Sequence, residues 1–235
     1  GLVNDFHLVH LGKFALGKFG VVFTENCAVE PRGRVTQGDL GLWDDSQIAS
    51  HKRLTDFIRG EGVLSATQIT HSGRKGSSAQ PWHGGMMIDK AHGGWDTAAP
   101  SPLALLPGEA PPHEIDAAGL KAIHQAFVDA AKRAQAMGLE MIELHGAHGY
   151  LLHEFLSPIA NQRNDNYGGN FANRARFPLQ VFNAVRKVFH GVLGMRLSAS
   201  DWIEGGWDLE QTTDFTKQLK QAGADFVHVS SGGIS

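Results

Sequence analysis

Short apolar segments alternate with longer segments of helical periodicity along the chain, and this alternation limits the possible fold more than any other feature. Five segments are nearly uninterrupted apolar runs and predict strands, namely 21–29, 63–70, 139–144, 192–199 and 225–231. Helices are predicted for 4–20, 44–62, 120–137, 173–189 and 208–223. Strands that are apolar throughout are typical of a parallel sheet with helices on its faces, so the sequence predicts an α/β fold.

Two architectures share this alternation, the open doubly wound sheet and the eight-stranded (β/α)8 TIM barrel. Five strands are too few to close the barrel, and the chain begins with a helix and ends just after a strand. We therefore expect either an open sheet or one part of a longer barrel. No repeat or linker divides the sequence, so residues 1–235 are expected to form a single domain.

The segment 71–113 interrupts the alternation with glycine, proline, serine and tryptophan and has little periodicity. A connection of this length inside a compact domain is usually either functional or disordered. Trp82 and Trp95 favour a packed flap over a disordered segment, because disordered segments are poor in aromatic residues.

Composition narrows the choice of partner. The chain is 42% apolar and 19% charged, as in globular proteins, and its net charge of −3 includes no basic stripe for nucleic acid. No apolar run has membrane-spanning length, and no signal-peptide pattern opens the chain. Cys27 is the sole cysteine, so we expect a packed thiol in an intracellular, cytoplasmic protein. A small-molecule partner is expected. The sequence does not determine the oligomeric state, and a homo-oligomer is one of the possible states.

Two large polar side chains, Gln68 and Arg196, lie inside predicted strands. In both architectures function gathers at the carboxyl ends of the strands. A buried guanidinium is costly unless it meets a negative charge or strong acceptors, so Arg196 needs a partner. That partner is either a ligand or a salt bridge to Glu143 or Asp201, and Gln68 is either a ligand contact or a core amide bonded to the backbone.

The stretch "ELHGAHGYLLHEFLSP", residues 143–158, places His145, His148 and Tyr150 directly after an apolar strand. One interpretation is a metal site completed by His153 and Glu154, although no further set of Cys and His residues accompanies them. The other interpretation is that two imidazoles donate hydrogen bonds to one oxygen of a substrate, while the phenol supplies a proton.

The stretch "HSGRKGS", residues 71–77, also follows a strand and contains Arg74 and Lys75. These cations either meet a phosphate or a carboxylate, or form a solvated basic turn.

Three long motifs resemble the old yellow enzyme family of FMN-dependent ene-reductases, most closely its bacterial branch with His-x-x-His in the site. The motifs are "VFTENCAVEPRGRVTQGDLGLWDD", "TQITHSGRKGSSAQPW" and "ELHGAHGYLLHEFLSPIANQRNDNYGGNFANRARF". The combination of His-Gly-Ala-His-Gly-Tyr-Leu with Tyr-Gly-Gly and Asn-Arg-x-Arg-Phe is specific. The resemblance extends over essentially the whole chain.

The resemblance implies a (β/α)8 barrel that binds FMN noncovalently at the strand ends and accepts electrons from NADH or NADPH. Gln68 and Arg196 would contact the flavin, and Asn26 stands where the family usually has a small residue beside it. His145 and His148 would grip the carbonyl oxygen of an α,β-unsaturated substrate, and Tyr150 would protonate its α-carbon. The family's first strand and last two strands have no counterpart in the sequence, which implies an internal part of the barrel.

Other functions stay open at this point. Family members that act on acyl-CoA thioesters, often as one domain of a larger flavoprotein, carry a run similar to the one around Arg74 and Lys75, so an unsaturated acyl-CoA is an alternative substrate. More distant alternatives are a flavin-free structural barrel and a metal-dependent hydrolase that uses the histidines.

Overall fold

The computed structural model describes residues 1–235 and contains one six-stranded parallel sheet. The strand order is β2-β1-β3-β6-β7-β8, and every neighbouring pair is parallel. The strands are β1 Val21–Ala28, β2 Leu40–Gly41, β3 Leu64–Thr70, β6 Met141–Gly146, β7 Val192–Ser198 and β8 Phe226–Ser230. All five predicted strands are confirmed, whereas the two-residue strand β2 is too short to produce a pattern in the sequence.

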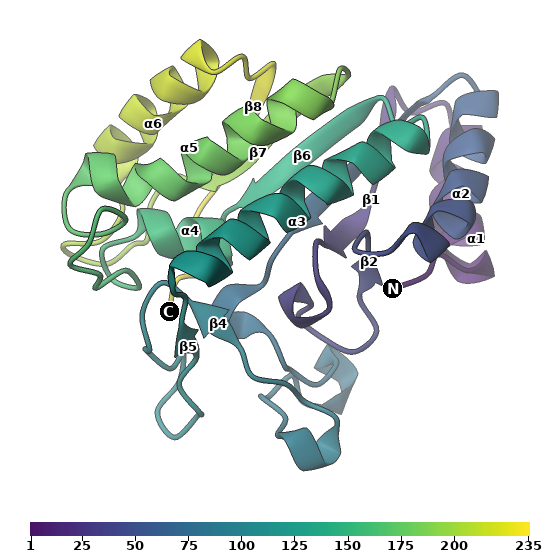
Figure 1. The fold of residues 1–235 in the computed structure, drawn as a ribbon. Helices are drawn as coiled ribbons and strands as arrows, with labels where there is room; N and C mark the ends of the chain where they lie inside the picture. Colours follow the sequence, from purple (N-terminus) through teal and green to yellow (C-terminus); the bar gives the residue numbers. More distant parts are fainter.

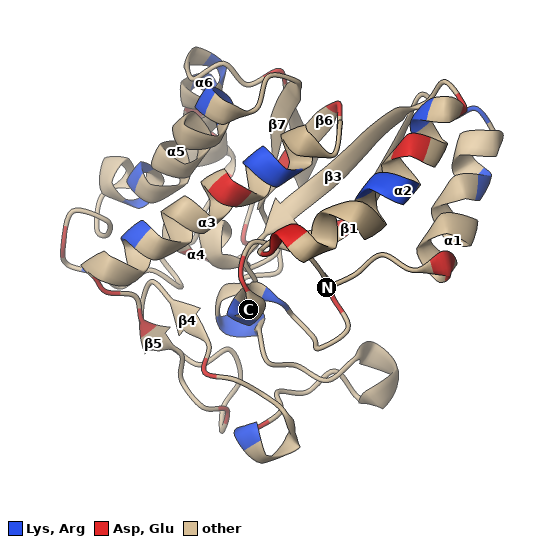
Figure 2. Ribbon diagram, turned by 45° about the vertical axis from the view of Figure 1, so that its right-hand side comes forward, with Lys and Arg blue, Asp and Glu red and all other residues tan.

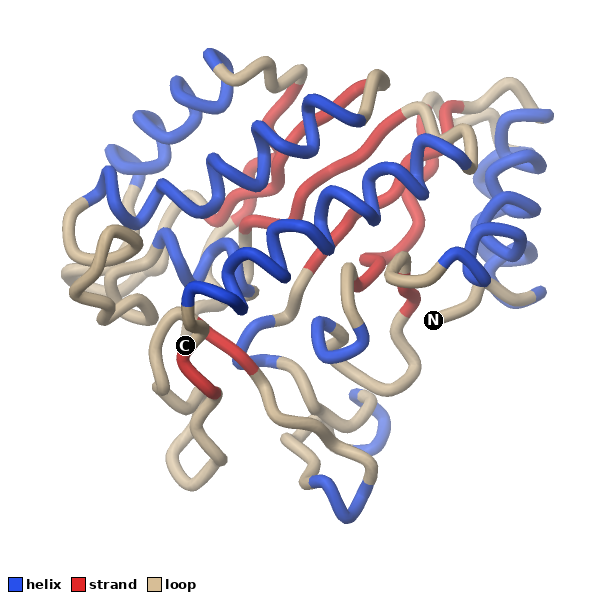
Figure 3. The backbone as a smooth tube through the Cα atoms, viewed as in Figure 1, coloured by secondary structure: helices blue, strands red, loops and turns tan.

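Five long helices alternate with the strands, as predicted: α1 Asp5–Leu16, α2 Ile48–Gly60, α3 Ala117–Ala136, α5 Phe171–Val188 and α6 Leu209–Gln221. Helices α3, α5 and α6 lie along the same face of the sheet. Helices α1 and α2 lie together at the end of the sheet near β1 (Figures 1 and 3). Acidic and basic residues are interspersed on α2 and α3 (Figure 2). None of the helices combines the length and the apolar character needed to cross a lipid bilayer.

Side-chain caps explain where several helices begin. Asn4, Asp116, Asn170 and Asp208 each accept a hydrogen bond from a backbone amide in the first turn of the following helix. Asp44 caps a 3-10 turn, Asp45–Gln47, that leads into α2, so the predicted helix start near Asp44 is correct in place but begins with a tighter turn.

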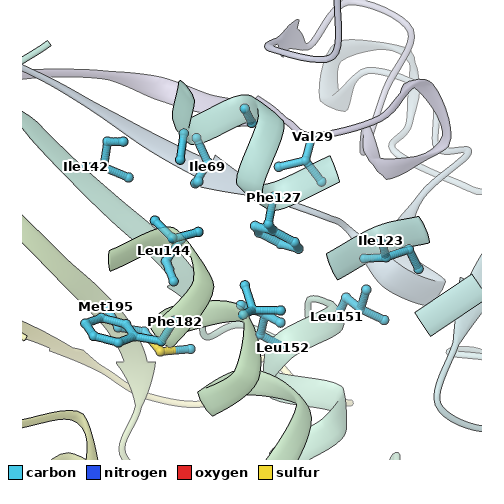
Figure 4. Packing of buried hydrophobic residues seen from close by; sticks show 14 of the residues in the cluster. Val29, Ile69, Ile123, Phe127, Ile142, Leu144, Leu151, Leu152, Phe182 and Met195 are labelled. Atoms are coloured by element: carbon cyan, nitrogen blue, oxygen red, sulfur yellow. The ribbon is translucent and has the colours of Figure 1, made fainter. Parts of the chain in front are cut away.

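The core lies between the sheet and the helices. Its main cluster has 33 buried residues, among them Ile142 and Leu144 of β6, Phe127 of α3 and Phe182 of α5 (Figure 4). Successive residues of a strand point to opposite faces of the sheet. Glu143 and His145, which alternate with Ile142 and Leu144, therefore point away from the helix layer. Cys27 is fully buried, as predicted, and burial raises the pKa of its thiol to about 12.

The segment 71–113 contains short structured elements. These are the 3-10 turns Gly73–Lys75, Pro81–His83 and Lys90–His92 and the paired strands β4 Ala98–Ala99 and β5 His113–Glu114. Trp95 anchors the flap, because its Nε1 donates to the carbonyl oxygen of Arg32 at 2.9 Å and its ring lies under the guanidinium of Arg34. The prediction that Trp82 also packs into the flap is wrong, because Trp82 is 77% exposed.

Candidate functional site

The strand register sets polar side chains in two neighbouring rows. Asn26 of β1 is paired with Gln68 of β3, and Gln68 is paired with Glu143 of β6. The second row begins two residues further along β6 and consists of His145, Arg196 and His228 on β6, β7 and β8. Side chains two residues apart in a strand point to the same face, so the two rows form one polar surface opposite the helix layer.

Both rows line a cavity of about 410 Å³. Four of the residues predicted from the sequence, Asn26, Gln68, His145 and Arg196, contribute to its wall, so the structure brings them together. The other lining residues are Phe23, Thr24, Glu25, Glu143 and His228. Because Phe23 is the single hydrophobic residue among these nine, the cavity suits a ligand rich in hydrogen-bonding groups.

Glu143 and His228 are site residues that the sequence reasoning missed. The buried carboxylate of Glu143 accepts a hydrogen bond from Gln68 Nε2 at 2.6 Å and lies 2.9 Å from His228 Nδ1. The signal that could have found them is spacing. Each lies two residues before another polar site residue, Glu143 before His145 and His228 before Ser230, and therefore shares its face of the strand.

Arg196 has an Nε that is buried without a hydrogen-bond partner in the protein. The alternative of a salt bridge to Glu143 or Asp201 is wrong, since Glu143 interacts with Gln68 and His228, and Asp201 with His153. The alternative for Gln68 is also wrong, because its amide bonds a carboxylate and not the backbone. An unpaired buried guanidinium N–H is costly, so Arg196 indicates a ligand that supplies an acceptor.

His145 and His148 face each other at the end of β6. His145 Nε2 lies 3.3 Å from His148 Nδ1, and the ring centroids are 5.1 Å apart. The amide of Ala147 donates to His145 Nδ1 at 3.2 Å, so the proton of a neutral His145 is on Nε2, the nitrogen that faces His148. On its other side, His148 Nε2 lies 2.7 Å from Ser230 Oγ.

Both imidazoles are held in the neutral form. Burial, together with positive charge at His148 and Arg196, lowers the pKa of His145 well below its usual range. Burial and the guanidinium of Arg196 also lower the pKa of His148, to about 4. Neutral imidazoles can donate a hydrogen bond to an oxygen without forming an ion pair with it.

Tyr150 is the N-cap residue of the short helix α4, Leu151–Leu156, and its ring centroid lies 4.6 Å from that of His145. It lines two hollows of about 470 and 240 Å³ rather than the polar cavity. The larger hollow shares Glu25 and Asn26 with the polar cavity, so the two adjoin. Burial and the charge of Asp39 raise the pKa of Tyr150, so the phenol keeps its proton at neutral pH.

His153 and Glu154, considered above as additional metal ligands, have other partners. His153 Nε2 lies 2.9 Å from Asp201 Oδ1, and Glu154 Oε1 accepts from the amide of Arg74 at 2.8 Å. No group of three or more histidine, cysteine, aspartate or glutamate side chains is arranged to hold a metal ion.

Arg74 and Lys75 do not form the solvated turn that was one interpretation of the sequence. Arg74 is buried, and its guanidinium donates to the carbonyl oxygens of Leu103 and Ile234. The ammonium of Lys75 donates to the carbonyl oxygens of His148, at 3.0 Å, and Gly233. Both cations are therefore bonded to the backbone, an environment that the sequence pattern does not reveal.

Comparison with known proteins places these features in a family. Residues 1–234 match the sequence model of the NADH:flavin oxidoreductase / NADH oxidase family. NADH:flavin oxidoreductase FG08077 of Gibberella zeae is 39% identical over 250 residues, which cover 100% of this chain and 60% of that protein. NADPH dehydrogenase of Bacillus subtilis is 38% identical over 234 residues, which cover 100% of this chain and 65% of that protein. The chain thus spans less than two thirds of the length of these relatives.

The fold is shared as well. A solved complex of 2-naphthoyl-CoA reductase with 2-naphthoyl-CoA superposes with a TM-score of 0.86 at 30% identity, covering 99% of this chain and 36% of that one. The parallel sheet with its helices is accordingly part of a (β/α)8 barrel, as the sequence motifs imply. On its sequence and its fold, the chain belongs to the NADH:flavin oxidoreductase / NADH oxidase family, that is, to the old yellow enzymes.

Proposed function

We propose that the full-length protein is an ene-reductase that reduces the C=C bond of α,β-unsaturated carbonyl compounds with NAD(P)H. FMN and a nicotinamide nucleotide are the cofactors of its family. The observation that carries the proposal is the meeting of His145, His148 and Tyr150 beside a polar cavity that contains Gln68 and Arg196. Two neutral donors, a protonated phenol and an unpaired guanidinium suit carbonyl activation next to a flavin.

The residues of the polar cavity fit FMN. The Nε of Arg196 lacks an acceptor within the protein, and the flavin ring edge is rich in carbonyl oxygens and ring nitrogens that could supply one. Gln68 and Asn26 would add amide donors from the neighbouring strands. The chemistry that FMN supplies when bound is hydride transfer, first from NAD(P)H and then to the alkene.

The side chains of this chain would perform the remaining steps. His145 and His148 donate N–H groups to the substrate's carbonyl oxygen and withdraw electron density, which makes the β-carbon electrophilic. Neither ring needs to lose or gain charge to do so, because both are neutral. Tyr150, whose raised pKa keeps its proton in place, delivers that proton to the α-carbon.

Tyr150→Phe tests the proton-donor role in the full-length flavoprotein. We expect alkene reduction to slow by about a hundredfold, since general acid catalysis contributes on that order, while reduction of FMN by NAD(P)H changes little. Stopped-flow absorbance of the flavin follows the two half-reactions separately. Equal losses in both half-reactions would contradict the assignment of Tyr150.

A second candidate substrate is an unsaturated acyl-CoA thioester. The likeness to 2-naphthoyl-CoA reductase favours it, whereas Arg74 and Lys75 now offer little support because backbone carbonyls occupy them. The ratio of kcat/KM for a simple enone to that for an unsaturated acyl-CoA, measured on the full-length protein, separates the two. No structural observation favours a flavin-free barrel or a metal-dependent hydrolase.

A further inference from the structure

The peptide bond between His148 and Gly149 lies in an unusual turn. Both residues have left-handed backbone conformations, with φ of 58° at His148 and 72° at Gly149. Non-glycine residues rarely adopt this conformation, and a side chain at Gly149 would collide with the carbonyl oxygen of Gly233. The turn therefore depends on surrounding contacts, and it carries His148 and Tyr150 into the site.

Contacts hold this peptide bond at both of its polar ends. Its carbonyl oxygen, that of His148, accepts a hydrogen bond from Lys75 Nζ at 3.0 Å. Its N–H, that of Gly149, donates to His153 Nδ1 at 2.9 Å. A peptide bond is planar, so fixing both ends fixes the ψ angle of His148 and the φ angle of Gly149 together.

Asp201 lies beside His153. The two side chains are fully buried, and His153 Nε2 lies 2.9 Å from Asp201 Oδ1. Because Nδ1 accepts the N–H of Gly149, the ring proton is on Nε2; that nitrogen is close to the carboxylate but is not aligned with it for a hydrogen bond. Asp201 is itself oriented by Ser157 Oγ at 2.6 Å and the amide of Trp207 at 2.8 Å.

We propose that Lys75 and His153 are positioning residues that clamp the peptide between His148 and Gly149. The clamp sets the direction of the His148 imidazole and the starting point of the Tyr150 side chain. Neither residue touches the reacting atoms; both act through the turn, as a rigid support for a catalytic pair must. This inference rests on the proposed function of His148 and Tyr150.

Two amide substitutions of His153 separate positioning from general stability. In His153→Asn, the amide oxygen can take the place of Nδ1 and accept the N–H of Gly149, but the contact with Asp201 is lost. In His153→Gln, the amide nitrogen can take the place of Nε2 and donate to Asp201, but the N–H of Gly149 is left without its acceptor. Each variant thus keeps one of the two contacts.

The experiment uses the full-length FMN-loaded protein. Dissociation constants for phenol, a mimic of the substrate's enolate, come from flavin absorbance, and alkene reduction is followed after reduction of the flavin with dithionite. We expect His153→Gln to weaken phenol binding and slow alkene reduction by about tenfold each, the effect of one lost hydrogen bond to a buried group, and His153→Asn to stay within about threefold of wild type. Melting temperatures are measured in parallel.

Lys75→Met should resemble His153→Gln, because it releases the other end of the same peptide. Lys52→Met is the matched control, since Lys52 is exposed and pairs only with Asp56 on its own helix. Similar behaviour of the Asn and Gln variants, or losses that simply follow the melting temperatures, would overturn the clamp. A wild-type protein that neither binds phenol nor reduces enones would instead contradict the proposed function.

Discussion

At the level of single residues, Ser230 can bond to either tautomer of His148. Its hydroxyl lies 2.7 Å from His148 Nε2 and can act as donor or acceptor there. If Nδ1 of His148 is to donate to a substrate oxygen beside Nε2 of His145, then Nε2 of His148 must accept, and Ser230 must supply the proton of that hydrogen bond. Ser230 therefore allows both imidazoles to donate to the same atom.

Ser230→Ala should weaken phenol binding by about threefold to tenfold, because one hydrogen bond of about 1 kcal/mol that supports the donor tautomer of His148 is lost. Ser231→Ala is the control, since Ser231 is the exposed neighbour in the sequence. Titration of the flavin absorbance with phenol measures both. An unchanged dissociation constant for Ser230→Ala would show that the tautomer of His148 is set by other contacts.

Also at the residue level, the sequence revealed the predicted site residues for a clear reason. Gln68 and Arg196 are long polar side chains in apolar strands, and such side chains need a partner. Glu143 was considered only as a salt-bridge partner of Arg196, because a carboxylate at a strand end does not indicate a site residue until the register pairs it with Gln68. Lys75 was misjudged because its partners are backbone carbonyl oxygens, which leave no mark in an amino-acid sequence.

At the level of elements, the strands and long helices were predictable because their periodicity is set by the core they share. The packed flap was predicted but the elements within it were not, because its short turns and two-residue strands depend on tertiary contacts. Trp95 and Trp82 illustrate this, since the same residue type in the same segment is an anchor in one place and solvent-exposed in the other.

Trp95→Ala should destabilise the flap by about 2 kcal/mol, since it removes a half-buried ring, its stacking on Arg34 and its hydrogen bond to Arg32. Limited proteolysis should then cut within residues 71–113 faster than in wild type. Trp82→Ala offers a matched control, because the exposed ring of Trp82 contributes little to packing. Equal cleavage of the two variants would refute the anchoring role of Trp95.

At the level of the whole molecule, buried groups give the free energy of unfolding opposite dependences on pH. Burial lowers the pKa of His51 and of His148 to about 4, so both take up protons on unfolding and stability falls as pH falls from 6.5 towards 4. Burial raises the pKa of Glu154 to about 8, so it loses a proton on unfolding. Its contribution therefore decreases as pH rises from 4.5 to 8.

Glu154→Gln should remove the decrease in stability that Glu154 causes as pH rises from 4.5 to 8. The amide oxygen can still accept the N–H of Arg74, but the side chain no longer ionises. We expect the variant to melt about 3 °C or more above wild type at pH 8, with the difference shrinking towards pH 5. Thermal unfolding across this range, with the exposed Glu204→Gln as control, measures the effect. A difference that does not vary with pH would count against an ionisable Glu154.

The alternation of core and cavity residues along β6 restricts the sequence changes that this protein can tolerate. Ile142 and Leu144 belong to the core, while Glu143 and His145 line the cavity, so one inserted or deleted residue would exchange the two sets. Such a change would bury a carboxylate and an imidazole in the core and empty the site in a single step. Insertions and deletions in evolved or engineered variants should therefore be found in the flap and in the other loops. Strand β6 should change only by substitution.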